Sequence, residues 1–288
     1  MKISLYLIAA LAIGCDAGKD DTPEGDMDSS ASDSTTSSDT GYDPEDPNPF
    51  WKLVSAGEEH SCALDTEGKV TCWGDNEFNQ ISSTPDKGTY AWVSAGIAHT
   101  CALDIEGSIT CWGNNELNQV SSTPDKGTYA LVSAGGIHTC ALDIEGSITC
   151  WGNVPSNGSA PEGGPYTVVS AGFGHTCALD TKGSITCWGE DGYGQVSGAP
   201  DKGPYTVVSA GDDHTCALDT AGSITCWGDD ERGQVSGAPD NGTYAWVSAG
   251  NNHTCALLKQ GTDDAGYVFG DLECWGSDGY GQSTPPVP

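Results

Sequence analysis

The sequence predicts an all-β protein, a β-propeller of six repeats with four strands each. Three observations carry this prediction. Histidine recurs at nearly constant spacing, and twelve of the 13 cysteines recur in pairs that are each followed by tryptophan. The 288 residues also include 40 glycines and nine tryptophans at a hydrophobic content of 36%, which favours short strands and tight turns over one large core. Such repeats bury their faces against their neighbours.

The first residues indicate export. Within residues 1–14, Lys2 precedes an apolar run that is too short to cross a bilayer but matches the hydrophobic region of a secretory signal. The stretch from Leu11 to Cys15 resembles the lipobox of bacterial lipoproteins, although Ala12 stands where that pattern prefers leucine. The resemblance implies cleavage before Cys15, a lipid on that cysteine and an anchor in an envelope membrane, periplasmic or on the cell surface. The alternative is an ordinary signal peptide with a chance cysteine.

Residues 15–49 hold the lipidated cysteine and an acidic tether. Residues 16–49 contain eleven acidic side chains, ten serines and threonines, and Lys19 as their one basic side chain. Such a segment buries too little surface to offset its ordering entropy, so we expect disorder. The whole chain has a formal charge of -31 and one arginine, Arg232, which argues against nucleic-acid binding because that binding requires cations on phosphates.

Residues 50–288 form the predicted propeller domain, with a repeat clearest from Val93 to Gly113. The histidines are His60, His99, His138, His175, His214 and His253, at intervals of 39, 39, 37, 39 and 39 residues. The cysteine pairs are Cys62 and Cys72, Cys101 and Cys111, Cys140 and Cys150, Cys177 and Cys187, Cys216 and Cys226, and Cys255 and Cys274. These nearly equal intervals predict one blade per repeat of about 39 residues.

Each element of the unit follows from local pattern. In the second repeat we expect strands at 90–95, 99–104 and 108–112 and a short fourth strand at 119–121. Between the second and third strands, Asp-x-x-Gly fits a type I turn followed by a glycine at positive φ.

In the first repeat that turn places Cys62 opposite Cys72 in a pair without hydrogen bonds, where a cross-strand disulfide closes most easily. We therefore expect six disulfides, one in each blade. The alternative is a metal site built on His-x-Cys-x9-Cys, but the spacing is wrong for zinc, a fourth ligand is missing and export favours oxidation.

The motif from Ala-Gly-x-x-His-x-Cys to Cys-Trp-Gly-x5-Gln resembles the repeat of the regulator of chromosome condensation family over residues 51–288. The resemblance implies a β-propeller, usually of seven blades, whereas this chain has six repeats. The third repeat is two residues short and lacks the glutamine. The sixth carries extra residues between Leu258 and Glu273, which should lengthen its hairpin. The eukaryotic family member catalyses nucleotide exchange on a nuclear GTPase and contacts chromatin, and we expect neither activity of this chain.

The histidines occupy one repeat position, so a structural role done six times explains them better than catalysis, which needs one asymmetric constellation. We expect a non-enzymatic chain that holds no cofactor or metal. Two alternatives are a lyase or hydrolase acting on a small molecule in the axial channel, and a purely structural surface protein.

Positions that vary between repeats point to binding, because the scaffold does not dictate them. Apolar side chains at these positions form a candidate protein-binding surface: Ile97, Ile137, Phe173, Phe78, Leu117, Tyr193 and Tyr280. The alternative is that these are relaxed turn positions buried under neighbouring loops. The functional hypothesis is a monomeric, lipid-anchored propeller that binds an unknown protein in the envelope or outside the cell.

Overall fold

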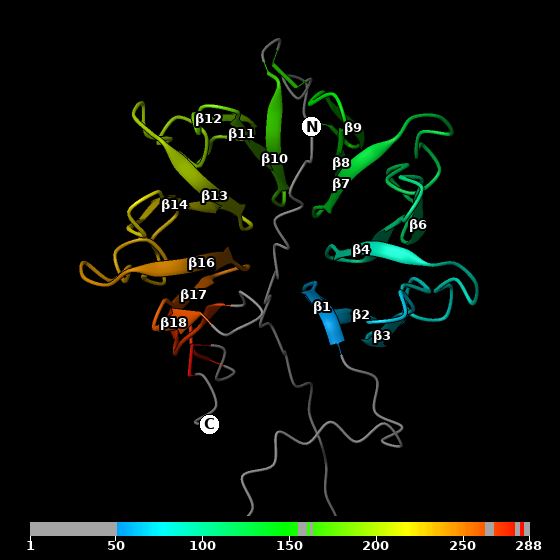
Figure 1. Cartoon of the computed structure of the whole chain (residues 1–288), viewed down its shortest axis with the longest axis horizontal. Coiled ribbons are helices and arrows are strands. Elements are labelled where there is room, and N and C mark those ends of the chain that lie inside the picture. Colours follow the sequence, from blue (N-terminus) through cyan, green and yellow to red (C-terminus); the bar gives the residue numbers. More distant parts are fainter. Residues whose placement is uncertain (1–50, 155–159, 162–163, 263–267, 280–282, 285–288) are drawn as a thin grey trace, which may run out of the picture.

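The computed structural model describes residues 51–154, 160–161, 164–262, 268–279 and 283–284. All regular structure in these ranges is β. Six antiparallel three-stranded sheets form six blades, and Figure 1 shows their first strands converging on the middle of the molecule. The all-β propeller prediction is therefore confirmed. Within the described ranges, no helical segment has the length and apolarity needed to cross a bilayer.

Each blade consists of a first, a second and a third strand in chain order. The first strands are β1 (Trp51–Ala56), β4 (Tyr90–Ala95), β7 (Tyr129–Ala134), β10 (Tyr166–Ala171), β13 (Tyr205–Ala210) and β16 (Tyr244–Ala249). The second strands are β2 (His60–Asp65), β5 (His99–Asp104), β8 (His138–Asp143), β11 (His175–Asp180), β14 (His214–Asp219) and β17 (His253–Leu258). The third strands are β3 (Val70–Gly74), β6 (Ile109–Gly113), β9 (Ile148–Gly152), β12 (Ile185–Gly189), β15 (Ile224–Gly228) and β20 (Leu272–Gly276).

The predicted fourth strand is wrong. In the second repeat the segment expected to form it lies in a turn. The Oδ1 atom of Asn115 accepts hydrogen bonds from the backbone nitrogens of Val120 and Ser121 at 3.0 and 2.8 Å. A side chain thus uses the donors that strand pairing would need, and the blades have three strands.

The predicted turn and disulfides are confirmed. In the first repeat, the Asp65 nitrogen donates to the Lys69 carbonyl at 3.0 Å, and Gly68 adopts a φ of 85° that a side chain would disfavour. This turn sets Cys62 opposite Cys72 with their Cα atoms 4.1 Å apart. The other five cysteine pairs form the same bond within their own blades.

The sixth repeat has the predicted longer hairpin. Its extra residues include two short paired strands, β18 (Gly261–Thr262) and β19 (Val268–Phe269), between the second and third strands of the blade. The Leu258 nitrogen donates to the Asp271 carbonyl at 2.9 Å, so the base of the insertion closes before the blade resumes.

The core lies between neighbouring blades. One cluster packs Leu53 and Leu64 of the first blade against Val93, Ala95 and Trp112 of the second, and all five side chains are buried. Similar clusters recur between the other consecutive blades of the propeller. Each blade therefore gains most of its apolar burial from its neighbours, as expected of repeat folds.

Recurring hydrogen bonds lock these blade junctions. Between the second and third blades, His99 Nε2 lies 2.8 Å from Thr139 Oγ1, and the Ala134 nitrogen donates to Ser94 Oγ at 3.0 Å. The histidine and threonine bond recurs in the pairs His60 with Thr100, His138 with Thr176, His175 with Thr215, and His214 with Thr254. One structural role explains these five histidines.

Candidate binding face

Two sets of loops lie on one face of the propeller. The turn between the first and second strands meets the loop that follows the third strand, since the Asp75 nitrogen donates to the Glu59 carbonyl at 2.8 Å. His60 also pairs with Gly74 at that end of the blade. We call this the variable face because both loops differ between repeats. The Asp-x-x-Gly turns lie at the other end of the strands and define the turn face.

The variable face carries the predicted binding residues that the structure describes. Tyr193 is 56% exposed, and Phe173 and Leu117 are each 38% exposed. The side chains of Phe78, Ile97 and Ile137 are half-buried. Tyr280 lies outside the described residues. The topology thus brings six candidates from four repeats onto one surface, and their role in binding stays a prediction.

Around the axis, the residue after each Ala-Gly pair forms a ring. Its members are Glu58, Ile97, Gly136, Phe173, Asp212 and Asn251 in blade order. A Cβ at Gly136 would lie 2.6 Å from Phe173 Cδ2 and 3.0 Å from Ile97 Cδ1. The two apolar side chains therefore meet over the Gly136 backbone, and we call these three residues the apolar arc.

The other half of this ring is polar. Asn251 Nδ2 donates to Glu58 Oε1 at 3.1 Å, which links the last blade to the first. Burial, the charge of Glu58 and the charge of Asp213 together raise the pKa of Asp212 to about 7. Burial also raises the pKa of Asp213, whose Oδ1 accepts a hydrogen bond from Gln195 Nε2 at 3.2 Å. Carboxyl groups are therefore crowded beside the apolar arc.

Charge is distributed unequally between the two faces. Among the described residues of the variable-face loops, the one basic side chain is Arg232. The acidic residues of these loops are Glu58, Glu59, Asp75, Glu77, Glu116, Glu190, Asp191, Asp212, Asp213, Asp229, Asp230, Glu231 and Asp278. Lysines instead lie in or next to the turns of the opposite face: Lys69, Lys87, Lys126, Lys182 and Lys202. Both faces carry acids, but the variable face has the more negative net charge because only Arg232 offsets its acids among the described residues.

The chain has one clear family relationship. The model of the regulator of chromosome condensation (RCC1) repeat matches residues 51–80, 93–119, 167–195, 206–234 and 247–282. The chain belongs to the RCC1 repeat family. The third repeat, which lacks the glutamine of the motif, lies outside these matched ranges. No curated protein matches the sequence.

Several solved structures resemble this RCC1-type propeller. The ectodomain of the Physcomitrella patens receptor kinase CR4 has 26% sequence identity and a TM-score of 0.66 over 81% of this chain, which spans 65% of that ectodomain, just under two thirds. The ectodomain of the Arabidopsis thaliana receptor kinase ACR4 has 25% identity and a TM-score of 0.62, with 79% of this chain and 82% of that chain covered. Prp20p from Saccharomyces cerevisiae shares the fold at 19% identity and a TM-score of 0.66, with coverages of 82% and 74%.

The five histidines that bond a threonine of the next blade are poor proton acceptors at neutral pH. Burial lowers the pKa of His99 to about 3, with further lowering by His138 and His60. Burial likewise lowers the pKa of His175 to about 4. Within the residues that the structure covers, no group of three or more metal-ligating side chains has the arrangement of a metal site. The chemistry that these five histidines offer is hydrogen bonding between blades.

Two exposed apolar residues were missed from sequence. Ile105 and Ile144 are 63% and 64% exposed in adjacent turns of the turn face. Their position follows the aspartate of Asp-x-x-Gly, where other RCC1 repeats of this chain have Thr66, Thr181 and Thr220. A comparison of repeats at this turn position would have revealed the two isoleucines. They provide matched controls for substitutions on the variable face.

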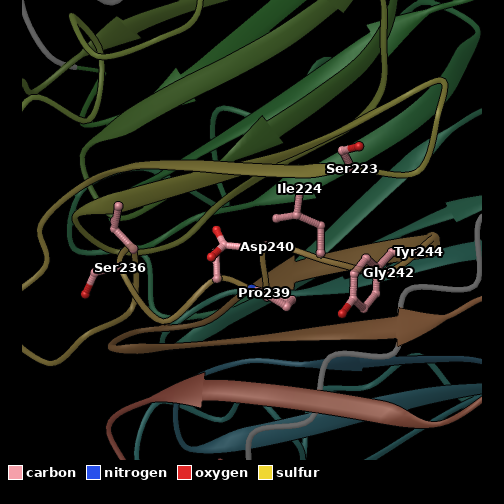
Figure 2. Close-up of a pocket in the computed structure, with 9 residues that line it drawn as sticks. Ser223, Ile224, Ser236, Pro239, Asp240, Gly242 and Tyr244 are labelled. Atoms are coloured by element: carbon pink, nitrogen blue, oxygen red, sulfur yellow. The ribbon is translucent and has the colours of Figure 1, made fainter.

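Figure 2 shows a pocket between the third strand of the fifth blade and the start of β16. Ile224, Pro239, Asp240 and Tyr244 are among its lining residues. The preceding repeat has closely similar residue types at the corresponding positions: Ser184, Ile185, Val196, Ser197, Ala199, Pro200, Asp201, Gly203 and Tyr205. The pocket is thus lined by the RCC1 scaffold and gives the fifth blade no chemistry of its own.

Proposed function

We propose that this chain is a lipid-anchored bacterial envelope protein whose RCC1-type propeller binds a protein partner through the variable face. The observation that carries the proposal is the exposure of Phe173, Leu117 and Tyr193 on that face. Large exposed apolar side chains on a rigid scaffold are typical anchors of protein recognition. The proposal assigns no catalytic step to the chain.

Covalent and sequence features support a location outside the cytoplasm. Six disulfides suggest an oxidising setting. The export signal and Cys15, which lie outside the described residues, supply the proposed route and anchor. Residues 16–49 would then hold the propeller away from the membrane. The two receptor-kinase ectodomains are examples of propellers of this type outside a cell.

Relatives support a protein as the ligand. The structure of Prp20p was reported with its binding to Gsp1p and histones, and yeast RCC1 has been crystallised bound to Kap60. We assign none of these partners to this chain. They support the use of the shared fold for protein recognition, while the acidic charge of the variable face disfavours nucleic acids as ligands.

Photo-crosslinking on intact cells tests the proposal. A benzoylphenylalanine in place of Tyr193 should attach one partner protein, which mass spectrometry then identifies. The same group in place of Ile105 on the turn face is the matched control and should not attach that partner. Adding Phe173→Asp to the Tyr193 probe should reduce the crosslink at least tenfold.

Two results would contradict the proposal. One is equal attachment of the same proteins from both faces, which would indicate proximity without recognition. The other is an undiminished crosslink in the Phe173→Asp variant when circular dichroism shows that the propeller is folded.

A further inference from the structure

The apolar arc is a defined anchor point at the centre of the variable face. Ile97 and Phe173 come from the second and fourth blades, yet atoms of both lie within 3.0 Å of the position that a Cβ at Gly136 would take. Any side chain at Gly136 would collide with Phe173 Cδ2 at 2.6 Å. The glycine therefore lets the two side chains join into one apolar surface, and Phe173 leaves 38% of its area open to solvent.

Carboxyl groups flank this surface on both sides. In the ring order, Glu58 precedes Ile97 and Asp212 follows Phe173. Glu58 contributes to the raised pKa of Asp212, so the two groups sense each other's charge. Glu190 lies next to the same arc, since its Cδ would be 2.5 Å from a Cβ at Gly174. The apolar arc therefore lies between acids from both sides of the ring.

An apolar anchor with acids at each end fits one kind of ligand. We propose that the apolar arc and the acids at its two ends, together called the axial mouth, bind a basic segment of a partner protein. One large apolar side chain of that segment packs on Ile97 and Phe173. Lysine or arginine side chains on either side of that residue pair with Glu58 and Asp212. The inference rests on the proposed function and names the chemistry of its partner.

The surrounding charge supports this choice of ligand. The acids of the variable face are offset there by Arg232 alone among the described residues, so a basic segment is attracted before contact. Pairing then offsets the mutual repulsion of Glu58 and Asp212. An acidic or neutral apolar segment would leave that repulsion in place.

Labelled heptapeptides provide a defined probe for the purified full-length protein. The peptide Gly-Ser-Lys-Leu-Lys-Ser-Gly carries both features, and its analogues replace the leucine by glycine or both lysines by glutamine. Fluorescence anisotropy at low salt should show the parent peptide binding at least tenfold more tightly than either analogue. Its affinity should fall as salt increases.

Matched substitutions locate the site. Phe173→Ser and Asp212→Asn should each weaken binding of the parent peptide about tenfold. On the turn face, Ile105→Ser and Glu67→Gln remove an exposed apolar group and one acid, and both should change the affinity less than twofold. Thermal melts establish that all four variants are folded.

Two outcomes overturn the inference. Equal affinity for the parent peptide and its glycine analogue would show attraction by charge without the apolar anchor. Equal losses in the variable-face and turn-face variants would show that binding is not at the axial mouth.

The two proposals can fail separately. If Tyr193 captures a partner on cells but the heptapeptide does not bind, the basic-segment inference fails and the binding function stands. If the heptapeptide binds as described but the cell crosslinks show no face preference, the proposed function fails instead.

Discussion

Five junctions between consecutive blades repeat one design, and the junction between the last and first blades differs from them. At the five regular junctions the histidine of one blade bonds the threonine of the next, as His175 does with Thr215 at 2.8 Å. At the corresponding position the first blade has Ser61. One hydrogen bond across this last junction joins Asn251 to Glu58.

Packing differs at the same place. Trp73 of the first blade is 44% exposed, whereas its equivalents in the other blades are only 5 to 8% exposed. A Cβ at Gly211 would lie 2.3 Å from the Gly250 carbonyl of the next blade, but the nearest atoms to a Cβ at Gly250 belong to His253 of its own blade. In Figure 1 the space between β1 and β16 is wider than that between the other neighbouring first strands.

Local sequence and blade structure are therefore nearly constant around the molecule. The stabilisation that contacts between neighbouring blades provide, here called the junction energy, is not. The first blade has the same strands, turn and disulfide as the second to fifth blades. Its tryptophan, Trp73, is nevertheless 44% exposed, whereas the tryptophan of each other blade is buried. Identical substitutions in an internal blade and in the first blade can therefore separate junction energy from blade energy.

Acidification should disturb all regular junctions at once and have the largest effect. Burial lowers the pKa of His138 and His214 to about 4, so the folded protein does not protonate them at a pH where the unfolded chain does. Stability should therefore fall as the pH drops from about 6.5 to about 4, by up to about 1.4 kcal/mol per pH unit for each such histidine. The raised pKa values of Asp212 and Asp213 oppose this trend.

Urea unfolding measured between pH 7 and pH 4.5 checks this expectation. A free energy of unfolding that stays constant over the range would show that the histidines are not buried in their neutral form.

Trp151→Ala and Trp73→Ala should give the next largest contrast. Trp151 is 5% exposed, and its Nε1 donates to the Gln119 carbonyl of the preceding repeat at 2.8 Å. Its loss should cost about 3 to 5 kcal/mol, the usual range for a buried tryptophan. The exposed Trp73 should cost less than half as much. Chemical denaturation of both variants measures the difference, and equal losses would mean that the last junction is packed like the others.

The smallest contrast involves one hydroxyl group at each type of junction. Thr139→Val removes the partner of His99 Nε2 inside a fully buried junction, so we expect a loss of about 1 to 3 kcal/mol. Ser61→Ala at the last junction should cost less than about 1 kcal/mol, because His253, which occupies the histidine position of that junction, is only half-buried. Thermal unfolding at neutral pH compares them, and a greater loss for Ser61→Ala would reverse the assignment of the regular junctions.

Much of the fold could be predicted from short-range pattern. The Asp-x-x-Gly turn and the alternation of side chains along a strand set Cys62 against Cys72 from local sequence alone. The fourth strand could not be excluded in this way, because Asn115 captures the backbone donors of residues five and six positions later in the loop. Strand propensity does not account for competition between a side-chain acceptor and a neighbouring strand for the same backbone donors.

The candidate site was predictable only in part. Differences between repeats singled out Phe173 and Tyr193. They did not reveal that the loops carrying these two residues lie on the same acidic face. Ile105 was missed because the turn containing it was treated as scaffold. Its 63% exposure is a property of the folded turn.

The sequence by itself determined the repeat, the first three strands of each blade and the disulfide pairing, because these depend on residues close to one another along the chain. Only the tertiary structure decided which junctions are regular, which tryptophan is exposed and which acids crowd beside Phe173. These properties depend on contacts between blades, whose residues are far apart in sequence, as for His99 and Thr139. Their energies follow from burial and neighbouring charge, which exist only once the blades surround the axis.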